Sequence, residues 1–192
     1  LQMVDASGRL FNGDELLYVL AKDRVNRGDK VGGVVGTLMT NLAVENAIKD
    51  LGIGFERANV GDRYVLELLK QKGWIIGGEG SGHLLCLDQH STGDGTIAAL
   101  QVLAAMSQAK KSLAQLLDSV KIFPQVLLNM KFKAGYDWKT DSTLKSKISQ
   151  VETDLKGTGR VLIRASGTEP VLRVMVEAQD GNVAMSAAKG IA

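Results

Sequence analysis

The sequence predicts an α/β protein: a larger domain with a mixed, largely parallel sheet, followed by a small α+β domain. Three observations indicate this fold. Up to about residue 106, short apolar runs alternate with runs of helical period, which is typical of a largely parallel sheet covered by helices. The alternation stops at the polar segment SQAKKS near residue 108. After Pro124 the order becomes strand, helix, strand, strand, helix.

The elements of the first part follow from apolar runs and from the residues that cap them. Strands are expected at 1–5, 31–37, 54–60, 74–78 and 83–87, and helices at 15–25, 41–51, 62–72, 96–106 and 112–120. Asp14, Asp62 and Asp94 each open a helix and are predicted N-caps. Gly52 and Gly73 close helices.

The second part begins after a predicted boundary at about 118–124. A strand at 125–132 and a helix at 143–155 precede two alternating runs, 160–164 and 171–178, which predict a hairpin. The last helix is expected from about Asn182.

Composition excludes several classes of protein. The 192 residues are 45% apolar and 23% charged, with a net charge of +2, so neither nucleic acid nor another polyanion is expected as a partner. No apolar stretch reaches the roughly 18 residues of a membrane span, and no membrane partner is expected. Cys86 lies in an apolar run and is expected to be a core thiol, which indicates a reducing cytoplasm. The start, LQMVDASG, lacks an initiator Met and suggests a chain cut from something longer.

The tip of the predicted hairpin, within RVLIRASGTEPVLRVMVE at 160–177, has the composition of a phosphate clamp. Arg164 ends the first strand and Arg173 lies on the second, and guanidinium groups bind phosphate oxygens in pairs. Ser166 and Thr168 can donate to the remaining oxygens, and Gly167 allows backbone N–H groups to form an anion nest. An ordinary surface hairpin is the alternative.

A second candidate site is the loop GGEGSGH at 77–83, which follows a buried strand. Open α/β sheets bind ligands at the carboxyl ends of their strands. Glu79 and Ser81 are spaced to hold two neighbouring sugar hydroxyls. His83 starts the next strand and is either a hydrogen-bonded strand residue or a general acid–base group. A flexible hairpin loop is the alternative for the segment.

Other polar residues are open to simpler accounts. Thr37 and Thr40 could line the same cleft, but a helix cap at Thr40 or Asn41 is the simpler reading. Arg63 is either solvated or directed at a ligand, and His90 is expected to be exposed. Two His and one Cys predict no metal site.

The loops GEGSGH and RASGTEP, together with LQMVDASG, VGDRYV, GDG at 93–95 and LRVMVE, resemble the α-D-phosphohexomutase superfamily over nearly the whole chain. The resemblance implies that residues 1–13 end the second of four domains, 14–118 form the third and 122–192 form the fourth. Its phosphoserine loop and its Asp-rich magnesium loop would lie outside this sequence, so no catalytic nucleophile or metal ligand is expected here. The superfamily more often has Gln or Met at the position of Gly80.

The resemblance also implies roles for residues. Glu79, Ser81 and His83 would bind the sugar, and Arg164, Ser166, Gly167, Thr168 and Arg173 would bind the phosphate that is not transferred. The motifs are most similar to the branch that interconverts glucosamine 6-phosphate and glucosamine 1-phosphate, with Mg²⁺ and a glucose or glucosamine 1,6-bisphosphate, for amino-sugar and peptidoglycan precursor synthesis. A glucose- or mannose-phosphate mutase and a non-catalytic phosphosugar-binding module are the alternatives.

Overall fold

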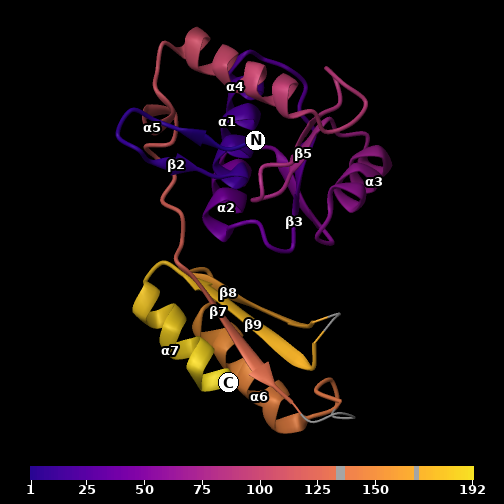
Figure 1. Cartoon of the computed structure of the whole chain (residues 1–192), viewed down its shortest axis with the longest axis vertical. Helices are drawn as coiled ribbons and strands as arrows, with labels where there is room; N and C mark the ends of the chain where they lie inside the picture. Colours follow the sequence, from indigo (N-terminus) through magenta and orange to yellow (C-terminus); the bar gives the residue numbers. More distant parts are fainter. Residues whose placement is uncertain (133–136, 167–168) are drawn as a thin grey trace. The chain divides into compact units, whose positions relative to one another are not determined.

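The chain forms two compact units, Leu1–Ile122 and Phe123–Ala192. The computed structural model describes residues 1–132, 137–166 and 169–192 (Figure 1). The predicted α/β class is confirmed. Among the described residues, no helix is long and apolar enough to cross a membrane.

The first unit is built on a four-stranded sheet of order β4-β3-β5-β6. Strands β3 (Gly33–Thr37), β4 (Gly54–Ala58) and β5 (Ile76–Gly78) are parallel, and β6 (Leu84–Cys86) runs antiparallel to β5. Two short strands, β1 (Met3–Val4) and β2 (Leu10–Phe11), form a separate antiparallel ribbon. The helices are α1 (Gly13–Asn26), α2 (Leu42–Asp50), α3 (Asp62–Lys72), α4 (Gly95–Ala109) and α5 (Leu113–Leu116).

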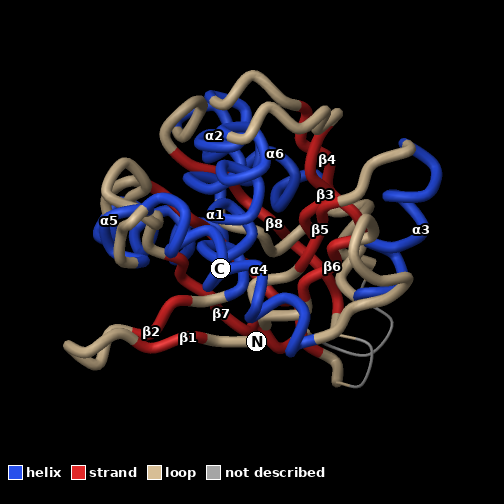
Figure 2. The backbone as a smooth tube through the Cα atoms, turned by 90° about the horizontal axis from the view of Figure 1, so that it is seen from above, coloured by secondary structure: helices blue, strands red, loops and turns tan. Residues whose placement is uncertain are grey.

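Helices cover both faces of this sheet because its strands are apolar on both sides. Val34 and Ile76 pack with residues of α1, α2 and α4. The next residue of β3, Val35, packs instead with Val65 and Leu69 of α3. Successive strand residues point to opposite faces, so one continuous apolar run serves both layers. Figure 2 shows α3 on one side of these strands and α1 and α2 on the other.

The second unit is a three-stranded antiparallel sheet of order β7-β9-β8 with two helices. Its strands are β7 (Gln125–Lys131), β8 (Gly159–Ala165) and β9 (Val171–Ala178), and its helices are α6 (Ser142–Asp154) and α7 (Gly181–Ile191). Leu172, Val174 and Val176 of the central strand pack with apolar residues of both helices. The alternate residues of β9 therefore lie on the opposite face of the sheet.

The helix starts correct two sequence predictions. The N-cap of α1 is Asn12, which forms a capping box with Glu15, so Asp14 is not the cap. Asp14 lies inside the helix and its carboxylate accepts a hydrogen bond from the backbone N–H of Asn41 at 2.9 Å. The N-cap of α3 is Gly61, and Asp62 is the first helical residue. Asp94 does cap α4, as predicted, by accepting from the backbone N–H groups of residues 96 and 97.

Helix α5 is also shorter than predicted. It ends at Leu116, whereas the apolar pattern predicted a helix to residue 120. Ser112 caps it with a capping box to Gln115. Leu117 and Val120 are buried outside the helix, so their apolar pattern reflects core packing and not helical period.

Candidate functional site

The carboxyl ends of β3, β4 and β5 bring three loops to one edge of the first unit's sheet. This follows because the three strands are parallel. The backbone N–H of Leu38, after β3, donates to the carbonyl of Ala58 at the end of β4 (2.9 Å). The backbone N–H of Gly61, after β4, donates to the carboxylate of Glu79, after β5 (2.8 Å).

The loop of residues 79–83 connects β5 to β6 as a hairpin. Inside it, the N–H of Glu79 donates to the carbonyl of His83 (3.0 Å), and the N–H of Gly82 donates to the carbonyl of Glu79 (2.9 Å). Gly82 has φ +96°, a conformation that glycine adopts without strain. The loop is also held from outside, because the N–H of Gly13 donates to the carbonyl of Gly80 (3.0 Å). It is therefore anchored on the start of α1.

Glu79 links this loop to the start of α3. Its Oε1 accepts from the N–H of Gly61, the N-cap residue of α3, which has no side chain to cap the helix itself. The negative charge of Glu79 is favoured there by the helix dipole. Within the described chain, Oε2 of this half-buried carboxylate has no hydrogen-bond partner. That oxygen can accept a hydrogen bond from a ligand hydroxyl.

Ser81 and His83 are exposed on the same loop. Together with Gly82 and Gly95 they line a hollow of about 250 Å³. Nε2 of His83 lies 3.8 Å from Oδ2 of Asp62, and both side chains are 54% exposed. The structure thus places Glu79, Ser81 and His83 on one loop, and it adds Gly61 and Asp62, whose contacts with that loop the sequence did not predict.

The side chain of Asp14 leaves little space for a side chain at Gly80. A Cβ on Gly80 would lie 3.3 Å from Oδ2 of Asp14, closer than most Cβ contacts. A larger residue here would require Asp14 to shift by a few tenths of an ångström. The side chains that flank position 80, Glu79 and Ser81, do not depend on that space.

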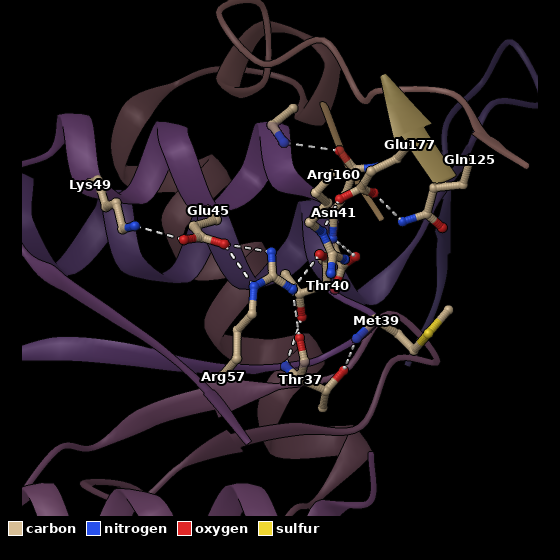
Figure 3. A network of polar contacts seen from close by, with 12 residues as sticks. Thr37, Met39, Thr40, Asn41, Glu45, Lys49, Arg57, Gln125, Arg160 and Glu177 are labelled. Carbon is tan, nitrogen blue, oxygen red and sulfur yellow. Dashed lines mark hydrogen bonds and ion pairs between the residues drawn. The ribbon is translucent and has the colours of Figure 1, made fainter. Parts of the chain in front are cut away.

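The loop after β3 uses its threonine hydroxyls internally (Figure 3). Oγ1 of Thr40 accepts from the N–H of Thr37 (2.9 Å), and Oγ1 of Thr37 accepts from the N–H of Met39 (3.2 Å). Asn41 caps α2 by accepting from the N–H of Ala43, as the simpler reading predicted. The two hydroxyls therefore shape the loop.

Arg57 of β4 fixes this loop from the neighbouring strand. Its Nη1 donates to the carbonyls of Thr37 and Thr40, at 2.8 Å each. Its Nε donates to Glu45 of α2 at 2.8 Å. Burial would raise the pKa of Glu45, but hydrogen bonds and charge interactions with Lys49 and Arg57 outweigh it and hold that pKa below its ordinary value.

Arg63 is exposed to solvent and paired along its own helix. Its side chain is 80% exposed and forms an ion pair with Glu67, one turn along α3, at 2.8 Å. The solvated reading of Arg63 therefore fits the structure. His90 is exposed, as expected.

In the second unit, the strand register places the two arginines of the predicted clamp opposite each other. Arg164 of β8 and Arg173 of β9 are cross-strand partners, and Asn129 of β7 is the partner of Arg173 on the other side. Like charges in this position destabilise a sheet. Among the described residues, no carboxylate forms an ion pair with either arginine. The pair therefore creates a positive site that an anion would relieve.

Another row on the same face of the sheet is neutralised. Gln125, Glu177 and Arg160 lie side by side on the three strands. Glu177 is fully buried and accepts hydrogen bonds from both neighbours (Figure 3). Arg160 thus has a carboxylate partner, whereas Arg164 and Arg173 share only each other and Asn129 across the sheet.

Ser166 begins the loop between β8 and β9. Its N–H donates to the carbonyl of Val171 (2.9 Å), and its hydroxyl accepts from the N–H of Glu169 (3.3 Å). Gly167 and Thr168, which the sequence assigned to the clamp, lie outside the described residues.

No metal centre is formed by the residues that the structure describes. In the ranges 1–132, 137–166 and 169–192, His, Cys, Asp and Glu side chains make no group of three that could hold an ion. These residues do not fit the Mg²⁺ that the superfamily resemblance implies, and no chemical step in this chain is assigned to it.

The fold is that of the last two domains of sugar-phosphate mutases. Residues 12–123 match the description "Phosphoglucomutase/phosphomannomutase, alpha/beta/alpha domain III", and residues 127–192 match "Phosphoglucomutase/phosphomannomutase, C-terminal domain". The chain belongs to the phosphoglucomutase/phosphomannomutase family, and the resemblance noted in the sequence is confirmed.

Within this family, the chain is similar to phosphoglucosamine mutases. The chain is 80% identical, over all 192 residues, to the phosphoglucosamine mutase of Polynucleobacter asymbioticus, and 62% identical to that of Delftia acidovorans. It spans 43% of the length of each. Among solved structures, the Aspergillus fumigatus N-acetylphosphoglucosamine mutase in complex with GlcNAc-6P and magnesium has a TM-score of 0.79 at 21% identity. That match covers 99% of this chain and 48% of the other, and it shows the shared fold.

Proposed function

We propose that this chain is the ligand-recognising part of a phosphoglucosamine mutase, which interconverts glucosamine 6-phosphate and glucosamine 1-phosphate through a bisphosphate. In that protein, residues 1–13 would end the second domain, 14–118 would form the third and 122–192 the fourth. The name of the 80%-identical relative supports the substrate. The observation that carries the proposal is the pair Arg164 and Arg173, opposite each other without a carboxylate partner in the described chain.

The loop of residues 79–83 would hold the sugar ring. Glu79 offers its Oε2 as an acceptor, and Ser81 offers an exposed hydroxyl that both donates and accepts. Two neighbouring ring hydroxyls can be held this way whichever carbon carries the phosphate. This matters because the bisphosphate must bind in two orientations, one for each half of the reaction.

The clamp would hold the phosphate that is not being transferred. Arg164 and Arg173 supply the charge, and Ser166, Gly167 and Thr168 are proposed to complete the set. A phosphate held by two guanidinium groups would be bound by charge-assisted hydrogen bonds, which are about twice as strong as neutral ones. Fixing both the ring and the distal phosphate would orient the other phosphate for transfer, and positioning of this kind supplies much of the catalysis in phosphoryl transfer.

The remaining chemistry would come from the rest of the longer protein. A phosphoserine there would give its phosphoryl group to the free sugar hydroxyl and form the bisphosphate. The bisphosphate would then reverse its orientation in the site and return its other phosphoryl group to the serine. Mg²⁺, when bound there, neutralises phosphate charge. The role of His83 as an acid or base stays a prediction, because its imidazole meets Asp62 only at 3.8 Å. Cys86, a buried free thiol, fits the proposed cytoplasmic setting.

Titration calorimetry of the 192-residue chain with glucosamine 6-phosphate tests the clamp. Arg164→Ala should weaken binding roughly ten- to a hundredfold, the equivalent of about 1.5–3 kcal/mol for a charge-assisted hydrogen bond. Arg164→Lys should recover only part, since a point charge cannot replace a planar fork. Lys145→Ala removes one exposed charge from α6 and is the matched control. Equal affinity of Arg164→Ala and Lys145→Ala would remove the clamp from the proposal.

The substrate is tested with a full-length chimaera, in which this chain replaces the matching 43% of the Polynucleobacter asymbioticus mutase. We expect turnover of glucosamine 6-phosphate well above that of glucose 6-phosphate or mannose 6-phosphate, and no turnover by the 192-residue chain alone. A preference for glucose or mannose phosphate would favour the phosphoglucomutase/phosphomannomutase alternative. Binding without turnover in the chimaera would favour the non-catalytic module.

A further inference from the structure

We infer that Asp62 is the residue that selects an amino sugar, by binding the ammonium group at C2 of a sugar held in the 79–83 loop. This inference rests on the proposed function and names the determinant of its substrate.

Asp62 and the residue before it contact the two ends of the 79–83 loop. The residue before it, Gly61, donates its N–H to Glu79 at 2.8 Å, which ties the start of α3 to the first residue of the loop. Its own Oδ2 lies 3.8 Å from Nε2 of His83, the last residue of the loop. The start of α3 is therefore tied to the loop at Glu79, and the Asp62 carboxylate lies beside His83 at the other end of the segment that would hold the sugar.

Asp62 is the most exposed of three carboxylates described at this edge, the others being Asp14 and Glu79. Asp14 is only 4% exposed and accepts a hydrogen bond from the backbone of Asn41. Glu79 has one oxygen committed to Gly61. Asp62 is 54% exposed, its Oδ1 accepts a hydrogen bond from the N–H of Arg63 at 2.8 Å, and its Oδ2 lies 3.8 Å from Nε2 of His83.

Asp62 lies at the start of a helix. It is the first residue of α3, where the positive end of the helix dipole favours an anion. The nearest cationic side chain along the helix, Arg63, is ion-paired with Glu67 and does not neutralise Asp62. The Asp62 carboxylate, beside the His83 that lines the hollow, is thus open to a cation.

An ammonium group is the feature that separates glucosamine phosphate from glucose phosphate. The two sugars offer the same hydroxyls to Glu79 and Ser81, so the loop alone cannot distinguish them. A carboxylate binds an ammonium by an ion pair as well as a hydrogen bond, whereas a hydroxyl at C2 offers the carboxylate a hydrogen bond without a net charge. Asp62 would therefore favour the amino sugar without contacting either the phosphate or the transferred group.

The variant Asp62→Asn, made in the chimaera, tests this directly. It removes the charge and keeps the size of the side chain. We expect kcat/KM for glucosamine 6-phosphate to fall about tenfold more than kcat/KM for glucose 6-phosphate, a ratio that corresponds to about 1.4 kcal/mol. Asp62→Glu should keep part of the preference. Asp50→Asn removes an exposed carboxylate from the last residue of α2 and should leave the ratio unchanged.

The outcomes separate this inference from the proposed function. If the unsubstituted chimaera prefers glucosamine 6-phosphate and Asp62→Asn lowers both substrates equally, Asp62 is structural and the inference is overturned while the function stands. If the unsubstituted chimaera turns over neither sugar, the proposed function fails. The preference is then measured by calorimetry of the 192-residue chain with the same two sugar phosphates, and equal affinities in the unsubstituted chain overturn the role of Asp62.

Discussion

Replacing Gly13 by Ala should displace the loop of residues 79–83, because the backbone of that loop lies directly against the start of α1. Gly13 is buried, and its N–H donates to the carbonyl of Gly80 at 3.0 Å. A Cβ at this position would lie 2.0 Å from the carbonyl oxygen of Glu79 and 2.6 Å from the nitrogen of Gly82. Both are backbone atoms, so no side-chain rotation can relieve the overlap, and the loop must move by more than an ångström.

The cost follows from three terms. Overpacking a well-packed site costs about 1–3 kcal/mol. Loss of the hydrogen bond between Gly13 and Gly80 adds about 0.5–1.5 kcal/mol. Replacing Gly by Ala in a helix returns up to about 1 kcal/mol. We therefore expect the free energy of unfolding of the first unit to fall by about 0.5–4.5 kcal/mol. Binding of glucosamine 6-phosphate should weaken because the loop has shifted.

Urea unfolding followed by the fluorescence of Trp74, in a Trp138→Phe background, measures this change in the unit that contains Gly13. Gly95→Ala is the matched control for stability, because Gly95 also starts a helix but a Cβ there would meet nothing within 4 Å. The unsubstituted chain is the reference for binding, because Gly95 lines the hollow beside the loop. If Gly13→Ala is as stable as Gly95→Ala and binds the sugar phosphate as well as the unsubstituted chain does, the loop is not held by this contact.

Three other outcomes can be measured on the 192-residue chain. Burial raises the pKa of the Cys86 thiol, so alkylation at pH 8 should occur only on unfolding, and native-state labelling at the rate of a free thiol would contradict this. Burial would raise the pKa of Glu45, but its two neighbouring cations lower it on balance, so this carboxylate stabilises the fold above its ordinary pKa of 4.5. That stabilisation is lost as pH falls through the lower folded-state value, and Glu45→Gln should reduce the acid-induced loss measured by urea unfolding between about pH 5 and pH 3. Arg164→Ala should raise the stability of the phosphate-free second unit by about 0.2–1 kcal/mol, because it removes like charges from a cross-strand pair. A loss of stability in that variant would show that the two arginines do not repel each other.

Much of the fold could be predicted because each element carries its own local pattern. β3 is buried at every position and its sequence is one continuous apolar run. In β9, every second residue is apolar and packs against the helices. The N-caps were harder. Asn12 and Asp14 are both suited to capping, and the choice depends on Asp14 binding the backbone of Asn41, a contact between residues 27 apart in the chain. Local sequence does not contain that information.

The same limit applies to the candidate site. Glu79 and Ser81 could be selected because glycines surround them after a buried strand. The hydrogen bond of Glu79 to the start of α3 could not be predicted from local sequence. It forms because β4 and β5 both pair with β3, which brings the loops after them together. The glycine at residue 61, which leaves the helix without a side-chain cap, was the one local signal that a distant acceptor was needed.

In the second unit, one face of the sheet carries two rows of residues that differ in how their charges are neutralised. Glu177 is buried between Gln125 and Arg160, and a buried charge persists only when it is paired and hydrogen-bonded. That row is complete without a ligand. Further along the same strands and on the same face, Arg164 and Arg173 lie opposite each other. In the described chain, no carboxylate pairs with either of them. Since the sheet accommodates a carboxylate between arginine and glutamine in one row, we propose that the charge that neutralises Arg164 and Arg173 is supplied by the ligand.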